Sequence, residues 1–174
     1  NNICTHCYSW TMLKTFRKNM APALERNSIL LNSKILHPDA LPVINQAFFR
    51  FNSHGELALD KKKATINLIN YINIAIKNPH CNFALWTKRF DIIKPYFDKN
   101  KKPKNFILVY SNPKINHIFK KPPKHFDKTF NNVYENIEIK KQNCTGQKCK
   151  DCLLCYKLNT TNTIVEKVKS YGKK

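Results

Sequence analysis

The chain has 174 residues, enough for one domain with a buried core, and no segment of it repeats. Its 31 Lys and Arg residues outnumber 11 Asp and Glu residues, which gives a formal net charge of +20 at pH 7. Its seven cysteines are clustered and odd in number, which argues against a secreted disulfide framework and favours a reducing compartment. No apolar run approaches the roughly 20 residues of a membrane-spanning helix. We expect a single domain over residues 1–174, in the cytoplasm and with no membrane contact; the oligomeric state stays open.

The first half of the chain predicts helices around one strand. A helical segment follows Cys7 and breaks near Pro22. The run at 47–51, AFFRF, predicts a strand that ends in a polar turn over 52–55. Asp60 is a suitable N-cap for a helix over 61–78, which Pro79 ends. Two apolar stripes at helical spacing are expected to face the core: Leu24, Ile29, Leu30, Leu31 and Ile35 in the earlier helix, and Ile66, Leu68, Ile69, Ile72, Ile74 and Ile76 in the later one.

The second half adds further alternating elements. A strand is predicted in 81–89, a short helix over 90–97, a strand in 105–113 and a loop over 113–123. A fourth strand is predicted at 130–139 and a short terminal helix at 163–172. Strands with continuous apolar runs that alternate with helices predict an α/β fold with a parallel sheet of three or four strands and right-handed helical crossovers. A Cys-rich segment at 143–157 is appended to it.

Polar residues follow each of the first three predicted strands. Since the carboxyl ends of parallel strands meet at one edge, where ligands bind in such folds, the three tips together indicate a site. Taken singly, each residue is more often a simple strand terminator. In an enzyme, His54 would transfer protons, Ser53 and Glu56 would orient a polar ligand, and Lys88 or Arg89 would hold an anion. The other candidate ligand-binding residues are Asn52, Ser111 and Asn112, and Thr87 and Tyr110 lie at the same tips.

The cysteines of the Cys-rich segment predict a metal site. Cys144, Cys149, Cys152 and Cys155 have the spacing C-x4-C-x2-C-x2-C, whose overlapping steps put three thiolates on one turn. This suits a [4Fe-4S] cluster better than zinc, which usually takes two C-x2-C pairs separated by a longer loop. Zinc, and disulfides or free thiols, are the alternatives.

A second C-x2-C pair, Cys4 and Cys7, stands near the other end of the chain, so the two ends are expected to meet at the metal. Cys81, alone beside a predicted strand, is expected to be a small buried residue.

The excess of basic residues predicts contact with DNA or RNA. Candidate contacts are the groups Lys61–Lys63, Lys99–Lys104 and Lys120–Lys124, although no known nucleic-acid-binding motif accompanies them. An AT-rich genome would explain the many Lys, Asn and Ile residues. It would not explain the few acidic ones.

Several ordered motifs resemble the phage proteins grouped as gene product 88: CYSWTMLKTFRKN near the start, FFRFNSHGEL, FALWTKR and LVYSNP in the middle, and the terminal cysteines. The resemblance covers most of the chain. It implies a phage or mobile-element protein that works in a bacterial cytoplasm, and it carries no known activity.

A more distant resemblance is to radical SAM enzymes, which join a C-x3-C-x2-C motif to a parallel partial barrel with a Gly-Gly-Glu turn after its second strand. Here Cys4 and Cys7 resemble the last two cysteines, and Ser53 to Glu56 occupy a place like that turn. The resemblance implies S-adenosylmethionine as a cofactor. Three departures stand against it: His54 replaces a Gly, the domain is short, and the first cysteine would precede Asn1. Because the chain starts at Asn and not at Met, we expect a fragment, a processed chain or a disordered start.

Three functions stay open from the sequence. The first is an iron–sulfur enzyme with its site at the strand tips, with radical SAM chemistry as one form. The second is a basic nucleic-acid-binding protein in which the metal is structural. The third is a hydrolase of esters or phosphoesters that uses Ser53, His54 or the cluster.

Overall fold

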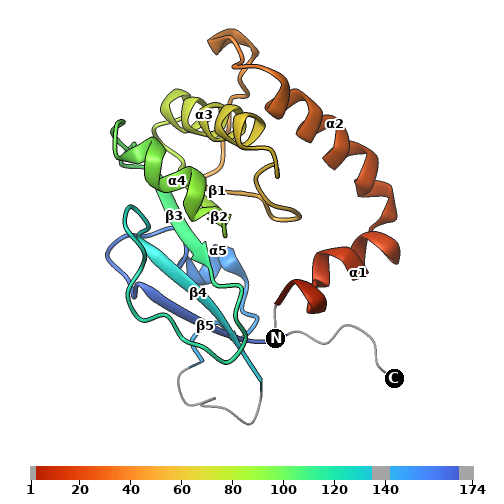
Figure 1. Ribbon diagram of the computed structural model, residues 1–174, viewed down its shortest axis with the longest axis vertical. Helices are drawn as coiled ribbons and strands as arrows, with labels where there is room; N and C mark the ends of the chain where they lie inside the picture. Colours follow the sequence, from red (N-terminus) through yellow and green to blue (C-terminus); the bar gives the residue numbers. More distant parts are fainter. Residues whose placement is uncertain (1–2, 135–141, 169–174) are drawn as a thin grey trace.

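The structure, a computed structural model, describes residues 3–134 and 142–168 (Figure 1). Its centre is a five-stranded sheet in the order β1-β2-β3-β4-β5, and every neighbouring pair is parallel. The parallel α/β prediction is thus confirmed, with one more strand than expected. The strands are β1 (Phe48–Phe51), β2 (Asn82–Thr87), β3 (Phe106–Ser111), β4 (Lys128–Val133) and β5 (Thr163–Lys167).

The prediction of a terminal helix over 163–172 was wrong for the part of this range that the structure describes. Residues 163–167 form β5, which pairs with β4 along its length, beginning with Thr129 opposite Thr163. Three β-branched residues in succession, Thr163, Ile164 and Val165, favour a strand, and a parallel partner supplies the backbone hydrogen bonds. The end of the predicted helix, from 169 on, and the second half of the predicted fourth strand, over 135–139, lie outside the described residues.

Helices precede and follow β1 along the chain. They are η1 (Ile3–His6), α1 (Tyr8–Lys14), η2 (Lys18–Met20), α2 (Ala21–Ser33), η3 (Pro38–Ala40), α3 (Lys61–Lys77), α4 (Phe90–Phe97) and α5 (Cys149–Cys152). Pro22 lies in the first turn of α2, where a missing N–H breaks no helical bond, so the break was predicted correctly. Asp60 caps α3 by accepting a 2.8 Å bond from the Lys63 amide, and α4 has its predicted bounds.

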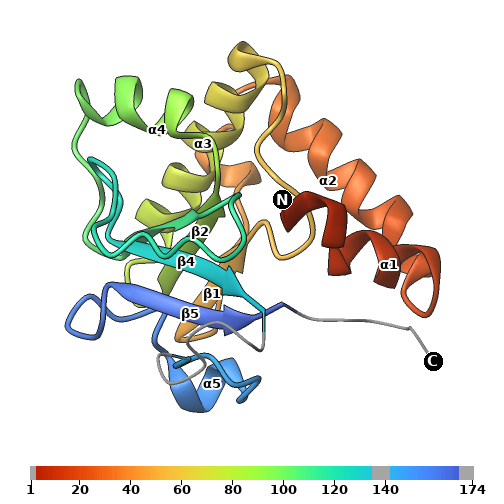
Figure 2. The same cartoon turned by 60° about the horizontal axis from the view of Figure 1, so that its bottom comes forward.

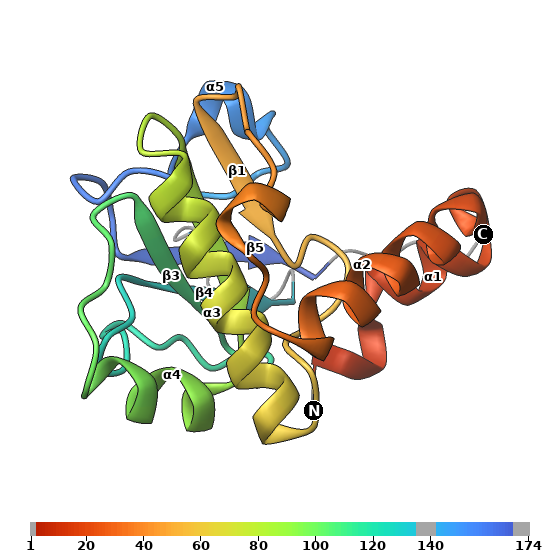
Figure 3. The same ribbon diagram turned by 90° about the horizontal axis from the view of Figure 1, so that it is seen from above.

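The apolar stripe of α2 does not form a core, so that prediction was wrong. No residue of α2 is buried, and Ile29 and Leu30 are 64% and 51% exposed. Helix α2 lies beside α3, and its Leu31 packs against the core. Helices α1 and α2 together extend away from the sheet (Figure 3). A stripe at helical spacing shows that one face is apolar, but not that another element covers it.

The buried face of α3 is rotated from the one predicted. Leu68, Ile72 and Ile74 are buried, but Ile76 is 61% exposed. Ile66 and Ile69 are half-buried. The remaining buried positions on α3 are Ala64, Asn67, Asn70, Tyr71 and Ala75.

Side chains alternate between the two faces of the sheet. On one face, Phe83, Leu85 and Leu108 pack with α3 and α4. On the other, the smaller cluster of Ile107, Val109, Phe130 and Ile164 packs with Trp86, Cys144 and Cys155. The Cys-rich segment therefore covers the face opposite α3 and α4, with α5 on that side (Figure 2).

The helical crossovers were predicted only partly correctly. Helices α3 and α4 connect β1 to β2 and β2 to β3. The connection from β3 to β4, over 112–127, contains no helix, and the described part of the connection from β4 to β5 contains only the single turn of α5. The second face of the sheet is thus covered by irregular chain, which leaves room for a cavity.

Candidate active site

A cavity of about 420 Å³ lies at the carboxyl edge of the sheet. Its walls come from three parts of the chain: the N-terminal segment, the ends of all five strands or the turns that follow them, and the Cys-rich segment. Because the strands are parallel and in sequential order, their carboxyl ends open toward the same space. The strand tips that the sequence singled out therefore meet here.

Cysteines from both ends of the chain line this cavity. Cys4 and Cys7 face it from the N-terminal segment, and Cys144, Cys149 and Cys155 face it from the Cys-rich segment. The remaining two cysteines lie elsewhere: the Cys152 sulfur accepts a 3.3 Å hydrogen bond from the Gln147 side chain, and Cys81 is fully buried in the core beneath α3 and α4.

The Cys-rich segment is held to the sheet at two points. The Cys144 amide donates a 3.0 Å hydrogen bond to the Val165 carbonyl on β5. At the other end of the segment, the buried Tyr156 ring lies 4.8 Å from the Phe48 ring on β1, centroid to centroid. Between these points Leu153 follows the end of α5, and its φ of 55° reverses the chain and returns Cys155 to the cavity.

The N-terminal cysteines are positioned by contacts of their own segment. The Ile3 amide donates a 2.9 Å hydrogen bond to the Pro113 carbonyl, just after β3. Ser9 and Arg17 contact opposite nitrogens of the His54 ring, at 3.1 Å to Nδ1 and 3.3 Å to Nε2. His54 thus joins the turn after β1 to the N-terminal helices, and it is not among the residues that line the cavity.

The electrostatics of His54 favour its neutral form. Burial, then the cations Arg17 and Arg50, lower the pKa of the imidazole below its ordinary value. A hydrolytic triad places a carboxylate on the second histidine nitrogen, whereas Arg17 occupies that place here.

Glu56 lines the cavity with its carboxylate already held in place. One oxygen accepts from the Thr87 hydroxyl and, at 2.9 Å, from the Leu57 amide, and the other accepts from the Lys88 amide at 2.7 Å. These bonds link the turn after β1 to the end of β2. A carboxylate fixed in this way can orient a polar ligand without first losing side-chain entropy.

The other predicted site residues divide into two groups. Those that line the cavity are Asn52, Ser53, Lys88 and Ser111. Arg89 and Asn112 do not line the cavity and have other contacts. Arg89 pairs with Asp91 at 2.9 Å, and the buried Asn112 donates a 3.1 Å bond to Asn131.

The sequence reasoning missed Arg50, Trp86 and Glu166, all of which line the cavity. The Arg50 guanidinium carbon lies 3.8 Å from the Trp86 ring centroid. A signal was present: Arg50 is the one charged residue in the apolar run AFFRF, and alternation puts it on the opposite face from Phe51. Glu166 was missed because its strand was predicted to be a helix.

The protonation of the Cys155 thiol and the spacing of the cysteines bear on whether this site can bind a metal. Burial, followed by the neighbouring Cys144 thiol, raises the pKa of Cys155 to about 12, against an opposing effect of Arg50. In the described part of the chain no three His, Cys, Asp or Glu side chains are grouped closely enough to hold one metal ion. The soft thiol donors fit iron or zinc, which would displace their protons, but binding requires the segments to close further.

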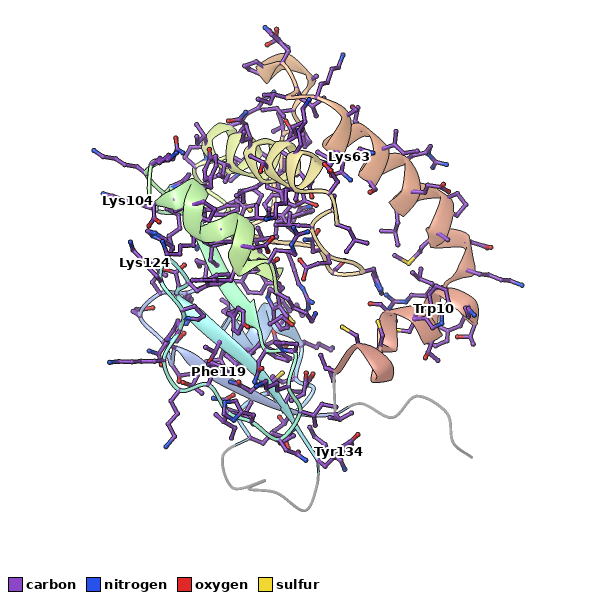
Figure 4. All side chains as sticks on the ribbon, viewed as in Figure 1. Trp10, Lys63, Lys104, Phe119, Lys124 and Tyr134 are labelled. Carbon is purple, nitrogen blue, oxygen red and sulfur yellow. The ribbon has the colours of Figure 1, made fainter. Side chains whose placement is uncertain are left out.

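Of the three predicted basic groups, the one at Lys61–Lys63 lies apart from the other two, and in the described residues none of the three lies in the cavity wall. Lys63 lies at the start of α3, whereas Lys104 and Lys124 lie together at another side of the molecule (Figure 4). Part of their charge is paired internally: Lys124 contacts Asp98 at 2.7 Å, and Lys102 contacts Asp127.

A family model described as gene product 88 matches residues 1–143. The match includes Cys4, Cys7 and the turn from Asn52 to Glu56, and it stops just before Cys144. No curated protein and no solved structure matches the chain. Among the helices that the structure describes, none is long and apolar enough to cross a membrane.

Proposed function

The chain belongs to the gene product 88 family, and we propose that this phage protein acts in the bacterial cytoplasm as an iron–sulfur enzyme. Its cysteines would hold a [4Fe-4S] cluster beside an active site at the carboxyl edge of the sheet. The observation that carries the proposal is the convergence of Cys4, Cys7, Cys144, Cys149 and Cys155 on one cavity with the strand tips. Cys144 and Cys155 also pack against the sheet, whereas Cys4, Cys7 and Cys149 are exposed, so that core packing does not account for their position at the same cavity.

Cys149, Cys152 and Cys155 are the proposed ligands, with Cys144 or one of the N-terminal pair as the fourth. Cys152 would turn from Gln147 toward the cavity. A bound cluster supplies electron transfer or, at an open iron, Lewis-acid chemistry. Of the chain's own side chains, Glu56 would orient a polar ligand and Lys88 would offset negative charge.

S-adenosylmethionine is the proposed ligand if the chemistry is of the radical SAM type. Glu56 lines the cavity from the turn that follows β1, and this turn resembles that family's Gly-Gly-Glu turn. The parallel sheet with its strands in sequential order resembles a partial barrel. Zinc is the alternative metal, in which case the site would be structural.

Anaerobic purification with iron, sulfide and zinc analysis tests the proposal. We expect about four irons and four sulfides per cluster, loss of most iron in Cys155→Ala, and unchanged iron in the control Cys81→Ala. Reductive cleavage of S-adenosylmethionine to 5′-deoxyadenosine would support the radical form. Stoichiometric zinc without sulfide would refute the cluster.

Nucleic-acid binding is the second candidate, supported by the net charge of +20. Binding would be strongly salt-dependent, because Lys and Arg displace counterions from phosphates. Replacing Lys62 and Lys63 with Gln, compared with replacing Lys101 and Lys104, would locate the contact face. An absence of binding to DNA or RNA at low salt would contradict this candidate.

Hydrolysis by Ser53 and His54 is the least supported candidate. His54 contacts Ser9, and the cation on its other nitrogen opposes the imidazolium that a triad forms. A screen of generic esters and phosphoesters with the Ser53→Ala and His54→Ala variants would test it.

A further inference from the structure

Three side chains that line the cavity carry buried hydrogen-bond donors without acceptors. These donors are Arg50 Nε, Asn52 Nδ2 and Trp86 Nε1, and none of them has a partner in the parts of the chain that the structure describes. Buried donors in folded proteins are almost always paired, because an unpaired one loses its bond to water without replacement. Three such donors on neighbouring elements of one cavity indicate an acceptor-rich ligand.

The fixed placement of Arg50 strengthens this reasoning. Its guanidinium carbon lies over the Trp86 ring, 3.8 Å from the centroid, on the face of the sheet toward the Cys-rich segment. Stacking of this kind holds a guanidinium in one orientation and leaves its edge for hydrogen bonds. No carboxylate in the described residues forms an ion pair with Arg50.

The side-chain amide of Asn52 is oriented by a hydrogen bond to its oxygen. The Tyr71 hydroxyl donates a 2.8 Å hydrogen bond to Asn52 Oδ1, so the oxygen end is already used and the nitrogen end remains. The residue follows Arg50 by two positions, in a left-handed conformation with φ 53°. The Glu56 carboxylate at the same cavity is occupied by three donors and does not neutralise Arg50.

We propose that Arg50, Asn52 and Trp86 form an oxyanion subsite that binds a carboxylate or phosphate group of the small molecule that this cavity accepts. A guanidinium edge matches either group, since both offer two coplanar oxygens. The subsite rests on the same cavity as the proposed function, and it requires no metal in order to bind.

Tryptophan fluorescence of the protein as purified, with its iron content measured alongside, tests the subsite. The chain has two tryptophans, and the exposed Trp10→Phe leaves Trp86 as the only reporter. In this background the probes are inorganic phosphate, AMP, acetate and methionine, each at constant ionic strength. We expect a saturable change with at least one probe, and the phosphate and carboxylate arms identify the group that is preferred.

Variants then assign the binding to these side chains. Arg50→Gln is expected to weaken binding at least tenfold, and Asn52→Asp to abolish it, because a carboxylate would repel the anion. Arg26→Gln, an exposed change of the same charge on α2, is the control and should leave affinity unchanged. Circular dichroism confirms that each variant is folded.

Two results of the binding experiments would overturn the subsite: no saturable response to any probe, or equal affinities in folded Arg50→Gln, Asn52→Asp and Arg26→Gln. If Arg50→Gln changed the iron content but not the affinity for the anion, the subsite would also be overturned, because Arg50 would then support the metal site of the cysteines. Iron analysis separates the two proposals: anion binding that depends on Arg50 in a protein that never takes up iron refutes the cluster and supports the subsite.

Discussion

Glu56 Oε2 accepts a 2.7 Å hydrogen bond from the backbone amide of Lys88, which fastens the turn after β1 to the residue after β2. The other carboxylate oxygen holds the Thr87 hydroxyl and the Leu57 amide. The cavity wall at this point is therefore one bonded unit built from two turns that are distant in sequence. Its rigidity depends on a single side chain.

Glu56→Gln should reduce stability as well as any activity. An amide can accept only on its oxygen, so an NH₂ group would face either the Lys88 or the Leu57 amide, and one donor would lose its bond. We expect the free energy of unfolding in urea to fall by about 1–3 kcal/mol. Glu25→Gln, on exposed α2, is the matched control and should change little. Equal unfolding midpoints for the two variants would contradict the fastening role.

The cysteines should separate into two classes on mutation. Cys152→Ala is expected to leave largely insoluble or unfolded protein, because three ligands on one turn organise the Cys-rich segment and metal-binding free energy is also folding free energy. If the N-terminal pair holds a separate cluster, Cys7→Ala should stay folded, with roughly half the iron and no turnover, since two thiols near a chain end contribute little to closure. Iron content and solubility are measured together. Parallel losses in both variants would indicate one shared cluster and would remove the radical SAM interpretation.

His54 should titrate below its ordinary pKa of 6.5, so that the imidazole is neutral at pH 7. Burial is the largest cause and the Arg17 cation the next. Removing the cation with Arg17→Gln should raise the pKa, because the imidazolium would no longer be opposed. Proton NMR of the ring between about pH 5 and pH 8 measures the midpoint, and Arg26→Gln is the control. An unchanged midpoint in Arg17→Gln would show that the contact does not form in solution.

Asp98 should contribute stability that acid removes. Hydrogen bonds from Lys124, Lys94 and His125 hold the pKa of its carboxyl well below the ordinary 3.8. A depressed folded-state pKa stabilises the protein above the unfolded value, and this stability is lost as the pH falls below it. Asp98→Asn should therefore unfold at lower urea than the wild type at about pH 5, with a smaller difference at about pH 2. A difference that is constant with pH would contradict the ion-pair network.

Elements whose signals are local were predictable. The apolar run before Asn52, the cap at Asp60 and the helix over 90–97 each depend on neighbours within a few residues, and all were predicted correctly. The fate of α2 and of residues 163–167 was not predictable in this way. An apolar stripe is buried, or a β-branched run is extended, only when another element supplies the partner surface.

The sequence by itself determined which chemical groups the protein has: the paired cysteines, the polar strand ends and the excess of positive charge. Only the tertiary structure decided which of them meet. It brought Cys4 and Cys155 to one cavity and turned Arg89 and His54 to structural contacts. It also placed Arg50 against Trp86. The physical reason is that side-chain alternation fixes only which face a residue occupies, whereas strand order and the path of the Cys-rich segment fix what lies across from it.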